Sequence, residues 1–522
     1  MKILTKAFTI MTTLALMACG GGGDGDSGGN SGGGGTPGGG ATLPVKRASR
    51  NLAFPGADGG GKNIKGGAEG EVYVVTNLND SGEGSLRWGL DGSNRTIVFA
   101  VGGNIELKTA LNIEKSNITV AGQTAPGGGI TLKNCPVYVT GSNIILRFLR
   151  FRMGDQSKSS FSISGETVTP DPDPLGVKGC KDILIDHCSV SWSIDECASF
   201  SNVTNFTLQY CIISESLNHA WHPKGDHGYG GIWGGKNASY HHNLLAHHNS
   251  RVPRFDHSYV AKGFRGPIDY VNNIAYNWGG NSTYGGESNT EQGIGLPFQI
   301  NMENNYYKAG PSSSGNVRNR LMELTSYCTN CISSGLATPS KLYINGNIIN
   351  GNAATWDNVD KEHSTGETRS EADLKAMAKS DTKLTTGYGG ATLNQLSFTQ
   401  SATDAYNSVL EFAGASKSRD AVDVRIVNDV KNGTGKLINS VSDTPGYPEL
   451  AAGTPITDTD RDGMPDDWEM AQMAALGVTG LGIDAFTPSA YNLSTKYTNL
   501  EVYMNELVSG CFPAGANAGN TR

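Results

Sequence analysis

The feature that most constrains the fold of this 522-residue chain is a short β-rich segment that recurs about once in thirty residues. Each later copy consists of a strand, a small polar turn residue and a second strand, as in Leu342-Tyr-Ile-Asn-Gly-Asn-Ile-Ile. The turn residues are Cys188, Cys211, Asn243, Asn273, Asn305 and Asn347, with spacings of 23, 32, 30, 32 and 42. A roughly constant coil with insertions on one side is typical of a solenoid, and here it predicts an all-β chain, a parallel β-helix with long loops.

The choice of turn residue supports this prediction over other all-β folds. Asn tolerates a left-handed φ and bonds neighbouring backbone, so it suits a ladder of tight turns. A β-sandwich also has many short strands, but it does not repeat one turn residue in every coil. Farther along, Ser370 begins a segment typical of an N-capped amphipathic helix, which we expect to pack across the β-helix or to cap its end.

The amino-terminal residues indicate export. Lys2 and Lys6 precede an apolar run over 7–18, and Leu16-Met-Ala-Cys-Gly follows in the pattern of a lipoprotein cleavage box. We expect Cys19 to carry lipid and to anchor the protein to the outer membrane or cell surface; the alternative is cleavage elsewhere and free secretion. The predicted divisions are a signal peptide over 1–19, a Gly/Ser-rich linker over 20–45, a β-helical domain over 46–440 and a small helical extension over 441–522.

Charge and cysteine usage narrow the possible partners. The net charge of −8 gives no global basic field, so nucleic acid is not expected as a partner, and a polyanionic ligand needs a local basic cluster or bridging cations. Eight cysteines besides Cys19 permit disulfides in an exported protein, and Cys328 could pair locally with Cys331. A zinc site at these two cysteines would need a second Cys or His pair nearby, and the sequence has none.

Two arginines flank a short turn at Arg251-Val-Pro-Arg254. Proline fixes its own φ and restricts the residue before it, so both arginines are expected on a defined loop. A guanidinium held in this way forks onto the two oxygens of a carboxylate ligand, although a solvated basic turn is the simpler alternative. The nearby His241, His242, His247 and His248 are interpreted as strand and turn residues rather than as a metal cluster.

A second candidate site is the acidic loop over 458–469. Its oxygen-bearing side chains stand at positions 1, 3, 5, 9 and 12, and Gly463 stands at position 6, as in an EF-hand calcium loop. Pro465 at position 8 favours a lone loop that leads into a helix over 468–476; the alternative is an acidic surface turn. The predicted ligands of a structural Ca²⁺ are Asp458, Asp460, Asp462, Asp466 and Glu469.

Several segments together resemble the pectate lyases of polysaccharide lyase family one, over about residues 50–350. They are Phe54-Pro-Gly-Ala-Asp-Gly-Gly-Gly, Val75-Thr-Asn-Leu-Asn-Asp-Ser-Gly, Ala121-Gly-Gln-Thr-Ala-Pro-Gly, Ile183-Leu-Ile-Asp-His-Cys-Ser-Val-Ser-Trp and the arginine segment. The resemblance implies a right-handed parallel β-helix and calcium-assisted β-elimination of polygalacturonate, the pectin backbone, giving unsaturated oligogalacturonates. We expect the enzyme to act as a monomer.

The resemblance also implies roles for individual residues. Arg251 matches the base that takes the C5 proton; because a guanidinium ordinarily stays protonated, this role predicts an alkaline optimum. Arg254 matches a substrate arginine but stands closer to the proline than in the family, so Arg265 is an alternative. Lys224 in the His222-Pro-Lys-Gly segment matches the substrate lysine.

The same comparison implies a catalytic calcium site. Its ligands would be Asp173, Asp195 and Glu196, although the last two are adjacent here and four residues apart in other members. Hard cations such as Ca²⁺ take carboxylate oxygens. Asp186 and His187 are interpreted as a buried, hydrogen-bonded structural pair.

Other readings remain open from the sequence alone. The substrate could be methylated pectin or another uronate polymer. A glycoside hydrolase on the same fold would use paired acids, but the Asn-Thr-Asp and Gly-His-Gly signatures of the polygalacturonases are absent. A non-catalytic surface protein that binds glycans could also keep this fold.

Overall fold

The computed structural model describes residues 42–155, 161–163, 166–168, 172–256, 264–288, 296–328, 335–362, 366–516 and 518–522. Residues Leu43–Arg522 form one compact unit, which holds both the predicted β-helical domain and the predicted extension. The signal peptide, Cys19, most of the linker and Cys331 lie outside the described residues. Among the described helices, none has both the length and the apolar character needed to cross a bilayer.

Three long sheets, which we call A, B and C, carry most of the described strands. Sheet A contains β1 (Glu71–Val75), β2 (Arg95–Phe99), β5 (Ile118–Ala121), β8 (Ile144–Arg147), β13 (Lys181–Asp186), β16 (Thr204–Gln209), β19 (Lys236–His241), β22 (Ile268–Val271), β25 (Gln299–Glu303) and β30 (Lys341–Asn345). Sheet B contains β3 (Gly103–Glu106), β6 (Ile130–Lys133), β9 (Leu149–Arg152), β14 (Ser189–Ser191), β17 (Ile212–Ser214), β20 (Leu244–Ala246), β23 (Ile274–Tyr276), β26 (Tyr306–Lys308), β31 (Ile348–Ile349) and β32 (Asn352–Ala353).

Sheet C contains β4 (Leu111–Ile113), β7 (Val137–Val139), β12 (Leu175–Lys178), β15 (Ala198–Ser201), β18 (Ile232–Trp233), β21 (Arg254–Phe255), β24 (Thr283–Gly285), β27 (Met322–Leu324) and β33 (Val359–Lys361). Two small antiparallel pairs lie outside these sheets: β10 (Phe161–Ile163) with β11 (Glu166–Val168), and β28 (Tyr327–Cys328) with β29 (Gly335–Leu336).

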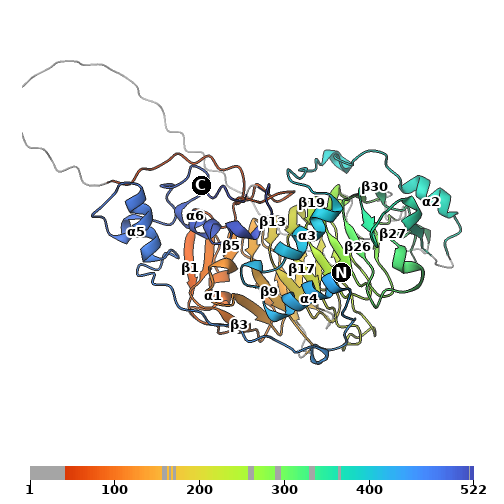
Figure 1. Cartoon of the computed structure of the whole chain (residues 1–522), viewed down its shortest axis with the longest axis horizontal. Coiled ribbons are helices and arrows are strands. Elements are labelled where there is room, and N and C mark those ends of the chain that lie inside the picture. Colours follow the sequence, from red (N-terminus) through yellow and green to blue (C-terminus); the bar gives the residue numbers. More distant parts are fainter. Residues whose placement is uncertain are drawn as a thin grey trace, which may run out of the picture. The chain divides into compact units, whose positions relative to one another are not determined.

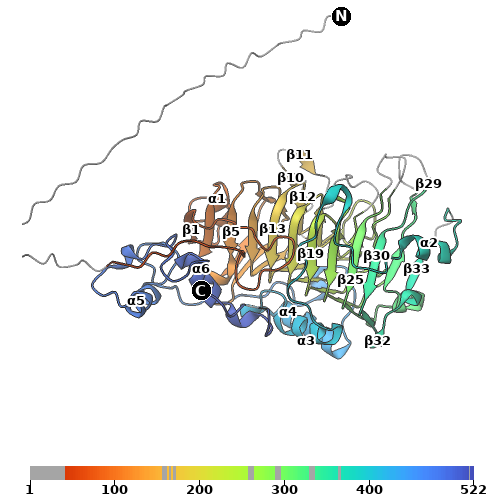
Figure 2. The same ribbon diagram turned by 90° about the horizontal axis from the view of Figure 1, so that it is seen from above.

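The chain visits the three sheets in turn, so that each coil adds one strand to each sheet. Neighbouring coils pair in parallel register; Leu208 of β16, for example, pairs with Ile185 of β13 and with Tyr240 of β19. Figures 1 and 2 show the coils stacked along one axis from β1 to β30. Alternate side chains of each strand point inward and form one continuous apolar core, which stabilises the stack by the burial of apolar surface. The predicted parallel β-helix is confirmed.

The predicted ladder of turn residues lies inside this core, between sheets A and B. The backbone N–H of Cys211 donates to Oδ1 of Asn243 at 2.9 Å, and the N–H of Asn243 donates to Oδ1 of Asn273 at 3.0 Å. Asn273 and Asn305 continue the same pattern to Asn347. The ladder therefore pairs polar backbone groups that the tight turn would otherwise leave buried without partners.

One detail of the ladder prediction was wrong. The left-handed φ does not fall on the ladder residues themselves but on the residue before each of them, for example His242 (φ 56°) and Asn272 (φ 58°). The ladder residue needs an ordinary φ because its amide side chain must point along the stack. A second ladder, in which the asparagines do have a left-handed φ, stands at the start of the sheet A strands; it runs from Asn94 through Asn117 to Asn143, and from Asn205 to Asn237.

Helices cover parts of the outside of the β-helix. α3 (Ala402–Phe412) and α4 (Ala421–Asn432) pack on the outer face of sheet B through a second apolar cluster. α2 (Glu371–Ala378) contacts β33, β27 and β30, and so lies at the end of the stack, as one of the two sequence predictions has it. Its N-cap is Ser370, whose side chain accepts from the N–H of Asp373.

The predicted extension packs at the opposite end of the stack. α5 (Asp466–Ala475) and α6 (Asn499–Glu506) join a third apolar cluster in which Met464 and Leu500 meet Val98 and Ala121 of the first coils. The short α1 (Leu86–Leu90) belongs to the first coil. α1 contacts β1 and β2 and buries Leu86 and Leu90 in the main core, so it covers this end of the stack, whereas α5 and α6 pack on the outer face of sheet A.

Most of the described cysteines are buried thiols rather than members of disulfides. Cys180, Cys188, Cys197 and Cys211 are buried free thiols and Cys511 is a half-buried one, while the buried Cys135 donates its thiol proton to the main-chain oxygen of Leu107. They behave as small apolar residues of the core. Of the proposed Cys328–Cys331 pair, the second residue is not among those described.

Candidate functional site

The candidate site lies at the edge of sheet C where its strands begin. Asp173 stands two residues before β12, and Asp195 and Glu196 stand just before β15. In the next coils, Tyr229 bridges to Glu196 on one side and to Ser250 on the other. The parallel register therefore brings Arg251, the residue after Ser250, to the same edge as the acids.

Three carboxylates form a cluster at this edge. One oxygen each from Asp173, Asp195 and Glu196 lies within 4.8 Å of the others. Asp195 and Glu196 are buried, and Asp173 is half-buried. Like charges at this separation repel strongly where water is scarce, so the ionised cluster needs a cation. All three donors are hard oxygens, and the donor set therefore fits Ca²⁺.

Arg251 provides part of the balancing charge. Its guanidinium forms an ion pair with Glu196 and stacks over the ring of Tyr229, with 4.1 Å between Cζ and the ring centroid. Its side chain is 18% exposed, so it is only partly shielded from solvent. One guanidinium against three carboxylates leaves two negative charges, which match one divalent ion. The backbone of Arg251 has a φ of 57°, an unfavourable value for arginine that the coil imposes.

Arg254 follows Arg251 by three residues and is the first residue of β21. It forms a 2.8 Å ion pair with Glu287 and lies over Tyr284, and its side chain is 20% exposed. Arg265 is only 1% exposed and donates to the main-chain oxygen of Glu287 at 2.9 Å. This burial disfavours the alternative in which Arg265 contacts substrate, because a ligand in the groove could reach little of its guanidinium. Arg265 instead supports the loop that carries the partner of Arg254.

A groove runs along the outer face of sheet C beside the acids. It has a volume of about 330 Å³ and is bordered by Asp173 and Glu196. The rest of its lining includes Tyr138, Thr140, Lys178, Ser199 and Ser201. Hydroxyl groups, an aromatic ring and an exposed ammonium group suit a polar, anionic chain.

The insertion between β17 and β18 rises over the same edge. Lys224 is exposed near its tip, and its N–H donates to Nδ1 of His222 at 3.2 Å. Three aromatic side chains near the insertion have different surroundings: Tyr229 lies under Arg251, Trp221 donates to the main-chain oxygen of Asp155, and Trp233 is fully buried against Tyr240. Stacking of Trp233 on a sugar ring is therefore excluded by its burial.

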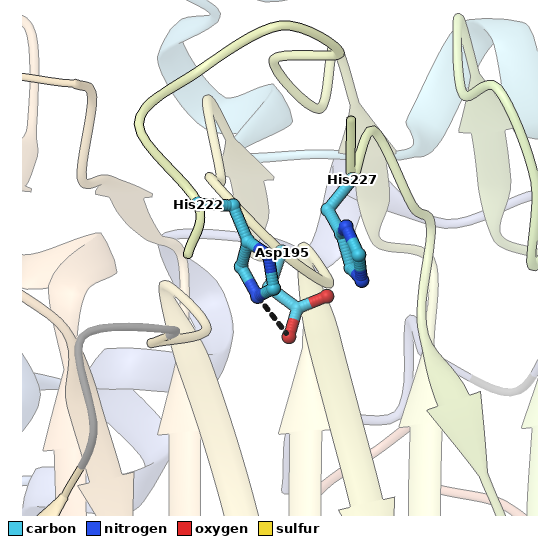
Figure 3. Close-up of side chains that lie close together, drawn as sticks. All are labelled: Asp195, His222 and His227. Atoms are coloured by element: carbon cyan, nitrogen blue, oxygen red, sulfur yellow. Dashed lines mark ion pairs between the residues drawn. The ribbon is translucent and has the colours of Figure 1, made fainter. Parts of the chain in front are cut away.

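The insertion also contributes two histidines that sequence reasoning did not single out. Imidazole nitrogens of His222 and His227 and an oxygen of Asp195 lie within 4.8 Å of one another. Figure 3 shows the two rings on the insertion, with the carboxylate of Asp195 beside them and the ion pair from His222 to Asp195. The sequence offered one signal, the His-x₄-His spacing, but on a loop this spacing does not fix where the side chains meet.

Five other histidines, which the sequence indicates to be strand and turn residues, are buried among the coils: His187, His241, His242, His247 and His248. Nδ1 of His187 bonds to Asp186 at 2.7 Å, and Arg147 donates to the other oxygen of Asp186. Burial lowers the pKa of His241 to about 3 and that of His248 to about 4, so both rings stay neutral. His241, His242, His247 and His248 are all buried under the coils, on either side of the Asn243 turn.

The loop over 458–469 has the predicted arrangement in most positions. Oxygens of Asp458, Asp460 and Asp462 lie within 4.8 Å of one another, and Gly463 has a φ of 88° at the sharp turn. The predicted helix that follows begins at Asp466, two residues early. Asp466, the predicted ligand at position 9, accepts from the N–H and Oγ1 of Thr459. In this conformation its carboxylate is therefore hydrogen-bonded within the turn.

Glu469 provides the test of whether this loop fits a cation. Its side chain is buried, and neither carboxylate oxygen has a hydrogen-bond partner among the described residues. Burial, together with the neighbouring Asp462 and Asp460, raises the pKa of Glu469 to about 9. A buried carboxylate without a hydrogen-bond donor is costly, and Ca²⁺ would supply the missing partner. The residues therefore fit the predicted ion.

Comparisons with known proteins find relatives that align with most of the chain. No protein-family profile matches the chain. A probable pectate lyase C of Aspergillus terreus is 34% identical over 473 residues, covering 88% of this chain and 95% of that protein. The probable pectate lyase C of Aspergillus flavus is 34% identical over 481 residues, with the same coverage. Among solved structures, a pectate lyase bound to a hexasaccharide aligns with 71% of this chain and 99% of its own, at 15% identity and a TM-score of 0.45.

These relatives put the chain in the class of the polysaccharide lyases. Within that class, because its identity of 34% to a curated relative extends over nearly the whole length of both proteins, the chain belongs to the pectate lyase family.

Proposed function

We propose that this protein cleaves polygalacturonate, the de-esterified pectin backbone, by calcium-assisted β-elimination. The observation that carries the proposal is the position of Arg251, which pairs with the acid cluster at the border of the groove. The groove would hold the polymer along sheet C. The reacting uronate would lie between Arg251 and the three carboxylates.

The acid cluster supports the calcium part of the proposal. Asp173, Asp195 and Glu196 would hold Ca²⁺, and the bound ion would withdraw charge from the substrate carboxylate and so make the neighbouring C5 proton more acidic. Glu196 belongs both to this cluster and to the ion pair with Arg251. Engagement of Glu196 in the cluster would therefore leave the guanidinium free to turn toward the substrate.

The proposed reaction breaks two bonds and forms one double bond in the sugar. A nitrogen of Arg251, in the neutral form of the side chain, takes the proton from C5, the electron pair forms a C4–C5 double bond, and the bond from C4 to the glycosidic oxygen breaks. The departing oxygen takes a proton from a water molecule and becomes the hydroxyl of the new reducing-end fragment, and the resulting hydroxide returns the arginine to its neutral form. The other fragment keeps an unsaturated, ultraviolet-absorbing end.

The cations around the site favour a substrate with free carboxylates over a methyl-esterified one. Arg254 has an accessible edge beside the site, Lys178 lines the groove, and Lys224 is exposed on the insertion. An arginine or lysine loses most of its attraction when the carboxylate becomes a neutral ester. We therefore assign substrate binding to Arg254 and Lys224, with Lys178 as a further contact.

Product analysis on a panel of uronate polymers, with calcium and with a chelator, tests the proposal. We expect unsaturated products from polygalacturonate, and a fall of roughly 10²–10⁴-fold in kcat for Arg251→Ala with little loss of binding. Arg47→Ala is the matched control, because Arg47 is an exposed surface arginine in the described chain. Full activity in Arg251→Ala would remove the base assignment.

The other two readings give different results in the same experiment. New reducing ends without ultraviolet absorbance would indicate a hydrolase. Binding of polymer with no cleavage of any uronate would indicate a non-catalytic glycan-binding protein.

We also infer that the protein is exported and anchored by lipid at Cys19, where it would cut polymer outside the cell. The support is the sequence over 1–20. Membrane fractionation of the wild type and of Cys19→Ala tests this. An equal distribution of both proteins would exclude the anchor.

A further inference from the structure

Asp195, His222 and His227 form a compact group of mixed oxygen and nitrogen donors above the acid cluster (Figure 3). Nε2 of His222 lies 3.5 Å from Oδ2 of Asp195, and the two imidazole rings stack with 3.7 Å between their centroids. Two ligands at about 2.0–2.1 Å from one tetrahedral ion lie roughly 3.3 Å apart. The ligand atoms of the three side chains lie within 4.8 Å of one another, near this separation, and the ring of His227 has to turn out of the stack before both imidazoles can direct a lone pair at one ion.

Burial restricts the side chains of His222 and Asp195, whereas His227 is half-buried. The side chain of His222 is fully buried and that of Asp195 is 12% exposed. Nδ1 of His227 bonds to the main-chain oxygen of Gly225 at 3.1 Å, which leaves Nε2 of that ring as the nitrogen with a free lone pair. A ring nitrogen tied to a carbonyl is the usual support of a metal-binding histidine.

The chemistry of the donors separates this group from the calcium sites. Ca²⁺ takes oxygen ligands and gains little from imidazole, whereas two imidazoles and one carboxylate suit Zn²⁺ and its neighbours in the first transition series. The acid cluster and the histidine group have Asp195 in common. An ion at one group therefore alters the charge and the ligands available to the other.

We propose that Asp195, His222 and His227 bind one divalent transition-metal ion, with Zn²⁺ as the occupant, and that this ion opposes calcium at the acid cluster. Binding through Nε2 of His222 moves the remaining ring proton to Nδ1 and releases the 3.2 Å bond from the N–H of Lys224. The tip of the insertion then shifts, and with it the lysine that we assign to substrate. The metal binding stands by itself, whereas its effect on catalysis rests on the proposed function.

Titration of the full-length, chelator-stripped protein with Zn²⁺ alone tests the binding. We expect the wild type to bind one equivalent that His222→Gln and His227→Gln each bind at least about 10-fold more weakly. His219→Gln is the matched control, because His219 lies on the same insertion, is exposed and pairs with Asp226. Unchanged Zn²⁺ affinity in both His222→Gln and His227→Gln would overturn the proposal.

Cobalt provides a second readout, which a purely structural role would not affect. Co²⁺ in place of Zn²⁺ should give the visible absorption of a four-coordinate site in the wild type and in His219→Gln, but not in His227→Gln. Because His227 is only half-buried, His227→Gln is expected to keep the fold, and its thermal unfolding checks this. Absence of the band from the wild type would also count against the site.

The calcium dependence of activity tests the antagonism. Added Zn²⁺ should raise the calcium concentration needed for half-maximal cleavage in the wild type and leave it unchanged in His227→Gln. If no uronate polymer is cleaved, the proposed function fails while the Zn²⁺ titration still decides the metal site. If cleavage is normal and Zn²⁺ raises the calcium requirement equally in both proteins, the antagonism through this site is wrong.

Discussion

Glu196 is the residue on which the two halves of the candidate site depend, because one carboxylate serves both the acid cluster and the ion pair with Arg251. Glu196→Gln removes one of three charges from the cluster and the counter-charge from the guanidinium. We expect the calcium concentration for half-maximal activity to rise at least about 10-fold, with partial recovery of activity at high calcium. Cleavage assays across a calcium series measure this.

The control for this substitution is Glu106→Gln, which also removes an ion-paired glutamate, in this case the exposed partner of Lys133 on β3. It should leave the calcium dependence unchanged. An unchanged calcium requirement in Glu196→Gln would show that the acid cluster does not bind the ion used in catalysis.

Asp186 supports a prediction about stability and pH. Burial opposes its ionisation, but His187 and Arg147 outweigh this effect and lower the pKa of Asp186 to about 2. The folded pKa is thus below the ordinary value of 3.8, so the stabilisation is present above that value and is lost as the pH falls toward 2. Asp186→Asn should cost about 3–5 kcal/mol near pH 6, because it leaves Arg147 buried without a counter-charge.

Denaturant unfolding of the wild type and of Asp186→Asn between pH 6 and pH 2 checks this. The difference between the two proteins should shrink as the solution becomes more acidic. A constant difference would mean that the ionised carboxylate is not what stabilises the turn.

At the residue scale, the sequence predicted the site residues that stand beside the strands of the β-helix. It did not predict the contacts of residues whose positions depend on loops. The resemblance to the pectate lyases implied that Asp173, Asp195 and Glu196 form one site, and their oxygens do converge. The burial of Arg265 and the meeting of His222 with Asp195 did not follow, because both depend on how insertions fold back over sheet C. No periodic pattern encodes that path.

At the scale of the element, the buried asparagine ladder provides the hydrogen bonds that hold the turn of one coil to the turn of the next. Oδ1 of Asn273 accepts from both the N–H and the Nδ2 of Asn243, and its own Nδ2 donates to the main-chain oxygen of Tyr240. Asn273→Ala leaves these partners buried and unpaired. Since each unsatisfied buried group costs about 1–3 kcal/mol, we expect a loss of more than 2 kcal/mol in the free energy of unfolding.

Asn205→Gly on the outer ladder is the matched comparison. Asn205 is half-buried and has a φ of 53°, which glycine adopts without strain. Its loss should cost much less than the loss of Asn273, as denaturant unfolding of both variants would measure. Equal losses would mean that turn conformation, rather than burial of the amide, gives the ladder its stabilising effect.

The two ladders also explain why the coils were predictable while the φ values were not. The sequence shows that asparagine recurs at both ends of the sheet A strands, for example at Asn205 and Asn243, but not which of these turns is buried. At the buried turn, the side-chain amide of each asparagine bonds to the next coil along the stack. In this geometry the left-handed φ falls on the preceding residue, for example His242. The coil therefore follows from the repeat, whereas the backbone detail follows from packing.

At the scale of the whole molecule, the loop over 458–469 joins the extension to the first coils. Met464, between its ligands, packs with Val98 and Ala121, and a side chain at Gly463 would meet Val98 and Val72. An ion that orders this loop should therefore stabilise the entire β-helical unit rather than a tail. The sequence predicted the loop by its ligand spacing but could not predict this contact, because nothing in the repeat marks which coil the extension meets.

Calcium bound at this loop should stabilise the protein and so raise its unfolding temperature. When the ion is at 100 times its dissociation constant, the free energy of unfolding should increase by about 2.7 kcal/mol. Glu469→Gln should lose most of this gain, because the buried carboxylate would no longer partner the ion. The folded pKa of Glu469, about 9, lies above its ordinary value of 4.5, so the calcium-free protein should lose stability as the pH rises between these values. The calcium-dependent gain should therefore grow over the same range.

Thermal unfolding with calcium and with chelator separates this ion from the one proposed for catalysis. Asp173→Asn should lose activity yet keep the part of the calcium-dependent gain that Glu469→Gln removes. Glu469→Gln should keep cleavage at temperatures where it remains folded, and Asp484→Asn, which removes an exposed carboxylate of the extension, should change neither. If Glu469→Gln and the wild type gained equally from calcium, the loop would be an acidic turn, and the helical extension would be held to the β-helix without a contribution from a bound ion, by apolar packing and by polar contacts such as that of Tyr491 with Glu69.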